Sequence, residues 1–91
     1  MSNIPTKKPI AVLCYKISEG FEYMLECLRD NVAEYSTHKR RIIDKTGEEY
    51  VIINSVNQLL GWEIKDFRIT PGFGMNPDAE IIRIEAQHRI R

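Results

Sequence analysis

No stretch of this sequence is apolar over the roughly 18 residues that a membrane-spanning helix requires. The longest apolar run, residues 9–15, has only the length of a strand. The basic N-terminus is not followed by an apolar segment of signal-peptide length or by a small-residue cleavage site. We therefore expect a cytoplasmic protein that has no membrane partner.

Cysteine is scarce as well. Cys14 and Cys27 are the only two, and neither belongs to a CxxC motif or to a cluster with histidine. Because each lies in an apolar segment, we expect two buried, reduced thiols, with a disulfide or a metal site as the alternative. No cofactor and no metal site are predicted.

An excess of charge of either sign is also missing. The chain has 13 Lys and Arg against 13 Asp and Glu, so its formal net charge is zero. This balance disfavours a strongly cationic nucleic-acid binder and an acidic mimic of DNA. With 91 residues, 43% hydrophobic and 29% charged, the composition is that of a small globular protein. We predict a flexible leader over residues 1–8 and a single α/β domain over residues 9–91.

The signatures of common enzymes are absent too. The sequence has no phosphate-binding loop, no dinucleotide-binding glycine motif, and neither an HExxH nor a GxSxG motif. A Cys–His nucleophile pair would require a cysteine near His38 or His88, but both cysteines are expected to be inert. We therefore predict no catalytic residues and a protein that is not an enzyme.

The clearest structural signal is an apolar stripe with helical spacing. Glu19 and Glu22 follow Ser18, a residue type that caps the positive end of a helix. The pattern predicts one long helix from about residue 18 to residue 35. The apolar members of the stripe are Phe21, Met24, Leu25, Leu28, Val32 and Tyr35.

Five other segments have a β-forming composition or an alternating pattern: 10–17, 39–45, 49–54, 62–70 and 80–90. Gly47 lies between the second and the third, which predicts a tight hairpin. A short helix is expected near residues 55–61, where Gly61 ends it. In the last segment, isoleucines such as Ile82 and Ile84 alternate with charged residues, which predicts a long strand with one face toward solvent.

These elements predict an α+β fold in which the long helix packs on a mixed sheet of four to five strands as a two-layer sandwich. The first strand is expected to pair in parallel with a later strand because a helical crossover follows it. Since so small a sheet leaves an open edge, we expect a homodimer, formed by edge pairing or by packing of sheet faces around Ile81.

The loop over residues 70–78 has an unusual composition. Its two glycines and two prolines explain the turn, but they do not explain the apolar Phe73 and Met75 between them. Either these side chains cover an open end of the core, or they form an exposed tip that contacts a partner. Trp62 has the same two interpretations, and all three are candidate partner-binding residues.

Basic residues are densest in the segment His38, Lys39, Arg40 and Arg41. One interpretation is structural, because cations stabilise the C-terminal end of the preceding predicted helix. The other is functional, because arginine and lysine bind the phosphates of nucleic acids or nucleotides. Arg83 and Arg89, on one face of the last predicted strand, would extend such a site.

One family resemblance follows from the order of these segments. The strand at 10–17 with the helix after it, the hairpin that ends at Tyr50–Ser55, the turn Asn57–Trp62 and the run Ile64–Ile69 resemble the centre of phage packaging-terminase ATPase domains. In that family a Leu-x-Gly turn precedes the strand with the Walker B acid. The phosphate-binding loop is missing here, and Ile69–Gly72 replaces the acidic pair. The resemblance therefore implies a phage-type α/β core, without ATP hydrolysis and without catalytic residues.

The leading functional hypothesis is a small non-enzymatic binding protein, an accessory factor of a phage or mobile element that acts by protein–protein contact in the host cytoplasm. Its expected partners are a second copy of the chain and an unidentified protein. The alternative is a module that binds nucleic acid or nucleotide phosphates through the 38–41 cluster and the C-terminal arginines. A small enzyme is the least favoured hypothesis.

Overall fold

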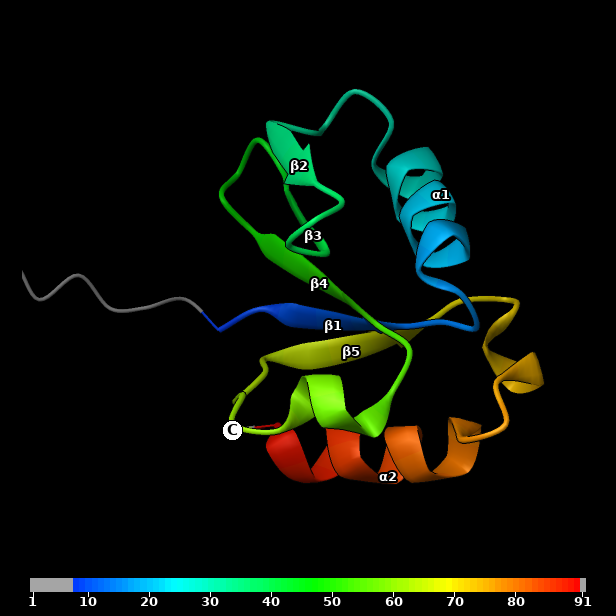
Figure 1. Ribbon diagram of the computed structural model, residues 1–91. Coiled ribbons are helices and arrows are strands. Elements are labelled where there is room, and N and C mark those ends of the chain that lie inside the picture. The colour runs from blue at the N-terminus through cyan, green and yellow to red at the C-terminus, as the bar shows by residue number, and fades with distance from the viewer. Residues whose placement is uncertain (1–7, 91) are drawn as a thin grey trace, which may run out of the picture.

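The computed structural model describes residues 8–90, so the predicted leader, except for Lys8, lies outside the described residues. Figure 1 shows the arrangement of the elements in this part of the chain. Their bounds are β1 (Ile10–Leu13), α1 (Ile17–Leu28), β2 (Glu34–Ser36), β3 (Arg41–Ile43), β4 (Glu49–Ile53), the 3-10 turn η1 (Val56–Leu59), β5 (Asp66–Ile69), the 3-10 turn η2 (Phe73–Met75) and α2 (Ala79–Arg89).

The predicted α+β fold with a mixed sheet is confirmed. The strand order is β2-β3-β4-β1-β5, and β1 pairs in parallel with both β4 and β5. The strands β2, β3 and β4 form an antiparallel meander. The parallel partners of β1 follow from the helical crossover after it, because a chain that returns over one face of a sheet re-enters in the same direction.

The sheet is covered on both faces, so the structure has three layers rather than the two predicted. α1 lies on one face and α2 on the other (Figure 1). The side chains of β1 alternate between these layers: Ala11 and Leu13 join the core under α2, whereas Val12 and Cys14 join the core under α1. A strand buried on both faces has a continuous apolar sequence, which is the pattern of residues 10–13. The predicted strand over 10–17 is therefore too long, because Ile17 already begins α1.

The first helix is shorter than predicted, because it covers Ile17–Leu28 instead of residues 18–35. Arg29 ends it with a left-handed backbone (φ 53°) and donates its N–H to the carbonyl of Leu25. The apolar pattern of the sequence continues past Arg29 because the chain after the helix returns to the same core. Val32 packs against that core although it lies outside α1. Tyr35 belongs to β2 and is exposed.

The turns around the middle of the chain are as predicted. The hairpin forms between β3 and β4, with Gly47 at φ 91°. The short helix is the 3-10 turn η1, which begins with a capping box between Ser55 and Gln58. The segment 62–70 is only partly a strand, because β5 covers Asp66–Ile69.

The predicted last strand, residues 80–90, is wrong, since this segment forms the helix α2. Its alternating isoleucines are also compatible with helical spacing: Ile82 and Ala86, four residues apart, are both fully buried. Glu80 in the first turn and Arg89 in the last turn complement the helix dipole. Ile84, expected on the same face as Ile82, is 45% exposed.

This difference gives a test of the helix. Replacement of Ile82 by alanine is expected to lower the free energy of unfolding by about 2–5 kcal/mol, because it leaves a cavity in the core. Replacement of Ile84 by alanine is expected to change it by only about 0.5 kcal/mol. Urea denaturation at low micromolar protein concentration measures both. Equal losses in the two variants would favour a strand, which places both side chains on one face.

Candidate binding cleft

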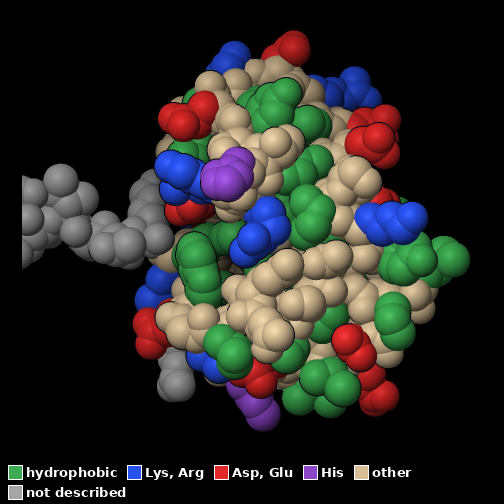
Figure 2. Space-filling model, in the orientation of Figure 1, with side chains coloured by type: hydrophobic (Ala, Val, Ile, Leu, Met, Phe, Trp, Pro, Cys, Tyr) green, Lys and Arg blue, Asp and Glu red, His purple; other side chains and the backbone are tan. Residues whose placement is uncertain are grey.

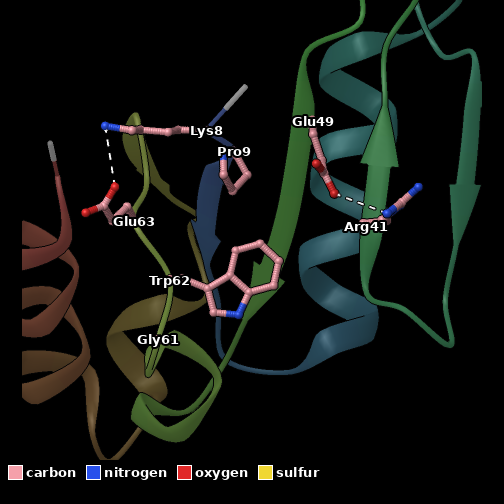
Figure 3. A pocket seen from close by; sticks show the side chains of 7 residues that line it. All are labelled: Lys8, Pro9, Arg41, Glu49, Gly61, Trp62 and Glu63. Atoms are coloured by element: carbon pink, nitrogen blue, oxygen red, sulfur yellow. Dashed lines mark ion pairs between the residues drawn. The ribbon is translucent and has the colours of Figure 1, made fainter. Parts of the chain in front are cut away.

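A cleft of about 620 Å³ opens beside the 61–63 segment, which connects η1 to β5 (Figure 3). It lies near the amino ends of β1 and β4, because Pro9 precedes β1 and Glu49 begins β4. Here we call it the Trp62 cleft. Its lining residues are Lys8, Pro9, Arg41, Glu49, Gly61, Trp62 and Glu63.

The cleft exists because one half of the sheet is left uncovered on the α2 side. The core on that side takes its strand residues from β1, β4 and β5, and among the described residues none comes from β2 or β3. The register places Arg41 opposite Val51, a β4 residue of this core. Arg41 and Glu49 therefore project from the α2 face of the sheet, where neither α2 nor η1 covers them.

Trp62 forms the wall of the cleft. Gly61, with φ 83°, turns the chain after η1, and the N–H of Trp62 donates to the carbonyl of Leu59 at 3.1 Å. Figure 3 shows the indole projecting from this connection toward β4. The side chain is 40% exposed, so one part of the ring is packed and another part is accessible to a ligand.

Two ion pairs lie on either side of the indole (Figure 3). Arg41 Nη1 is 3.5 Å from Glu49 Oε2, and Lys8 Nζ is 3.6 Å from Glu63 Oε1. Partly exposed pairs of this length contribute about 0–1 kcal/mol to stability, because water screens them. Arg41 can therefore turn to a ligand at little cost.

The basic cluster 38–41 forms the β2–β3 turn. Because α1 ends at Leu28, the cluster does not cap a helix, and the structural interpretation of its charge is wrong. The turn is fixed by Lys39 N–H to Ser36 Oγ at 3.2 Å and by a left-handed Arg40 with φ 54°. Figure 2 shows basic side chains gathered around a histidine on this side of the molecule.

Three of the four basic side chains of this cluster are without partners in the described part of the chain. Within residues 8–90, the side chains of His38, Lys39 and Arg40 make no hydrogen bond or ion pair, and Nε of Arg40 is buried as well. Arg41 alone is paired, and it also lines the Trp62 cleft. The cleft and the basic cluster thus share Arg41, and His38, Lys39 and Arg40 come directly before it in the chain.

The two arginines proposed to extend the basic cluster lie elsewhere. Arg83 and Arg89 belong to α2, on the opposite side of the sheet from α1, and far from the β2–β3 turn in Figure 1. Nε of Arg89 is 2.6 Å from Oε2 of Glu85, one helical turn earlier. The structure therefore divides the predicted phosphate-binding residues between two surfaces.

The predicted partner-binding residues are also separated. Phe73 is 3% exposed and packs in the core under α2, so it covers an end of the core rather than forming a tip. Met75, two residues later, is 71% exposed. Trp62 and Met75 lie before and after β5, at opposite ends of that strand (Figure 1). The three side chains do not form one surface.

Sequence reasoning missed the polar network at the carboxyl ends of the parallel strands. Glu19 Oε1 accepts from the N–H of Tyr15 at 3.0 Å, and Oε2 accepts from the N–H of Gly72 at 3.1 Å. Asn76 Nδ2 donates to the carbonyls of Cys14 and Asn54, at 3.0 and 2.9 Å. Ligands of open α/β sheets usually bind at this end, but here protein groups fill it.

The same network sets two pKa values. Burial raises the pKa of Glu19, but the nearby Thr70 hydroxyl and the hydrogen bonds from backbone N–H groups outweigh that effect and hold the pKa below its ordinary value. Burial, followed by the nearby charge of Glu19, raises the pKa of the Cys14 thiol to about 12. Cys14 is therefore an unreactive buried thiol, as predicted, whereas Cys27 is exposed, contrary to prediction.

Comparison with protein-family models, with curated proteins and with solved structures finds no match for this chain. The resemblance to the terminase region therefore stays a prediction. Within the described residues, no group of three or more His, Cys, Asp or Glu side chains is arranged to hold a metal ion. No helix in this part of the chain is long and apolar enough to cross a membrane.

The Glu19 network gives a prediction about acid stability. Replacement of Glu19 by glutamine is expected to lower the free energy of unfolding by about 1–2 kcal/mol at neutral pH, because an amide cannot accept both backbone N–H bonds. Since folding lowers the pKa of Glu19 from 4.5, its stabilising effect is present above that pH and is lost as the pH falls below it.

The measurement is urea denaturation of the parent and the variant across this pH range. The difference between them should be largest above about pH 5 and should shrink at lower pH. Glu26→Gln, on the exposed side of α1, is the control and should match the parent throughout. A constant difference at every pH would contradict the assigned role of the carboxylate.

Proposed function

We propose that the protein is a non-catalytic binding protein that holds single-stranded nucleic acid in the Trp62 cleft. In this proposal a base stacks on Trp62, and the 38–41 turn binds the neighbouring phosphates. Nucleic-acid binding was the alternative hypothesis from the sequence. The proposal combines its 38–41 cluster with Trp62, which the leading hypothesis had assigned to a protein contact. The observation that supports it is the position of Trp62 and Arg41 in one cleft.

The stacking surface is the first argument. An exposed aromatic ring binds any nucleobase by stacking, which contributes about 1–3 kcal/mol per base. Trp62 has this exposure, and Pro9 lies with it in the cleft. The large aromatic ring of a soluble protein is more often buried, so its placement at the wall of an open cleft favours a ligand with a flat face.

The second argument is the uneven distribution of charge. Although the chain is neutral overall, the cations Lys39 and Arg40 of the 38–41 turn have no partner within the described residues, while most other charges near the cleft are paired. Phosphates are the ligands that lysine and arginine bind by charge-assisted hydrogen bonds. A locally basic turn beside a stacking ring is the combination that single-stranded binders use.

The carboxylates of Glu49 and Glu63 are compatible with this ligand. Each is neutralised by a loose ion pair, so neither repels a phosphate strongly. Carboxylates accept hydrogen bonds from the amino groups of cytosine, adenine and guanine. Bases that carry an amino group should therefore bind better than thymine or uracil.

A protein partner is the second candidate function, as expected for an accessory factor of a phage or mobile element. The predicted contact loop does not form one surface, because Phe73 is buried. Exposed apolar side chains instead lie on and before α2, at Met75, Ile81 and Ile84. This surface is separate from the Trp62 cleft, so the two functions do not exclude each other.

The test uses the single tryptophan of the chain as its probe. A short single-stranded oligonucleotide of mixed sequence should quench the fluorescence of Trp62, and rising salt should reverse the effect. With three phosphate contacts, the logarithm of affinity should fall with the logarithm of salt at a slope of about 2. Absence of quenching at low salt would overturn the proposal.

Variants then assign the residues, with anisotropy of a labelled oligonucleotide as the readout. Trp62→Leu should weaken binding about 5- to 150-fold, as expected for loss of one stacked base. Tyr35→Leu, at an exposed aromatic residue away from the cleft, is its control. Lys39→Gln should reduce the salt slope by about 0.7, whereas Arg83→Gln on α2 should leave it unchanged. Equal effects in variant and control would contradict the assigned surface.

A further inference from the structure

One face of α2 carries apolar side chains that the fold leaves uncovered. Ile81 is 58% exposed and Ile84 is 45% exposed, while Ile82 and Ala86 on the other side of the helix are fully buried. At 100° per residue, Glu80, Ile81, Ile84 and His88 fall within an arc of about 100°. They form one stripe, named here the α2 stripe, which faces away from the core.

The two ends of the stripe carry different polar side chains. Glu80 lies in the first turn of α2, and His88 lies in the last turn beside Arg89. Within residues 8–90, the side chains of Glu80 and His88 make no ion pair or hydrogen bond. The stripe therefore has a carboxylate that accepts hydrogen bonds at one end, an apolar centre, and an imidazole whose N–H donates a hydrogen bond at the other end, so it is complementary to its own reversed copy.

We propose that the α2 stripe packs antiparallel against the α2 stripe of a second copy of this chain. With the twofold axis at Ile84, this residue meets its own equivalent, and Ile81 packs beside it. Glu80 and His88 are each four residues, or about 6 Å, from Ile84. The symmetry therefore places Glu80 of each copy opposite His88 of the other.

Antiparallel packing is also favoured by the helix dipoles, since the positive end of each α2 lies beside the negative end of the other. Exposed Met75 comes just before α2 and extends the apolar surface beyond the N-terminal end of the stripe. Because the apolar centre of the stripe consists of only two exposed isoleucines in each copy, the dimer should be weak. This inference does not depend on the proposed nucleic-acid binding.

Sedimentation equilibrium from about 10 μM to about 1 mM tests the dimer at concentrations suited to a small interface. The parent should pass from monomer to dimer within this range. Ile84→Glu should weaken association at least tenfold and leave the urea midpoint at low concentration unchanged. Tyr35→Glu, at an exposed residue of edge strand β2, is the matched control and should associate like the parent.

A charge exchange tests the antiparallel arrangement. Glu80→Lys and His88→Glu should each weaken association, because each removes the Glu80–His88 hydrogen bond, and the double variant should restore it, because it places a lysine opposite a glutamate across the twofold axis. A monomer at every concentration would overturn the proposal, as would a dimer that Ile84→Glu leaves intact. A loss with Tyr35→Glu would assign the contact to the sheet edge, and additive losses in the double variant would contradict the antiparallel pairing.

Discussion

Burial of β1 on both faces is the constraint on which the rest of this structure depends. All four of its residues are at most 6% exposed, and its two neighbours, β4 and β5, run parallel to it. A central strand of this kind needs a cover on each side, because its side chains alternate between the faces. α1 supplies one cover so closely that a Cβ atom on Gly20 would lie 2.6 Å from Cγ2 of Ile52. α2, η1 and η2 supply the other.

The Trp62 cleft follows from the width of these layers. Five strands at a spacing of about 4.8 Å make a sheet about 19 Å across between the outer strand axes. A helix with its side chains is about 10 Å wide, so α2 and the small η1 cannot cover the whole face. They lie under β1, β5 and the near part of β4. The uncovered remainder is where Arg41 and Glu49 meet Trp62, so the cleft is a direct result of a sheet wider than its cover.

The sequence allowed prediction of the parts that depend on local pattern. The continuous apolar run at β1, the apolar stripe of α1 and the glycine of the β3–β4 hairpin each have one physical reading. Residues 80–90 have two possible interpretations. The alternating isoleucines 82, 84 and 90 fit a strand, whereas the spacing of Ile82 and Ala86 fits a helix. The charged residues between them have high helix propensity and favour the helix. The cleft could not be predicted from the sequence, because Trp62 and Arg41 are brought together only by the register of the strands and by the turn at Gly61.

The two ends of the parallel strands have different roles in this fold. At the carboxyl ends, Glu19 and Asn76 occupy backbone N–H and carbonyl groups that a ligand would otherwise bind. These bonds join the loop after β5 to α1 and to the end of β1, and so contribute to stability. At the amino ends, Arg41 and Glu49 beside Trp62 form a long, partly exposed ion pair, which a ligand can replace at little cost. The carboxyl ends are thus held by hydrogen bonds, whereas Arg41 and Glu49 at the amino ends are only loosely paired. The proposed ligand therefore lies at the end opposite to the usual binding site of α/β sheets.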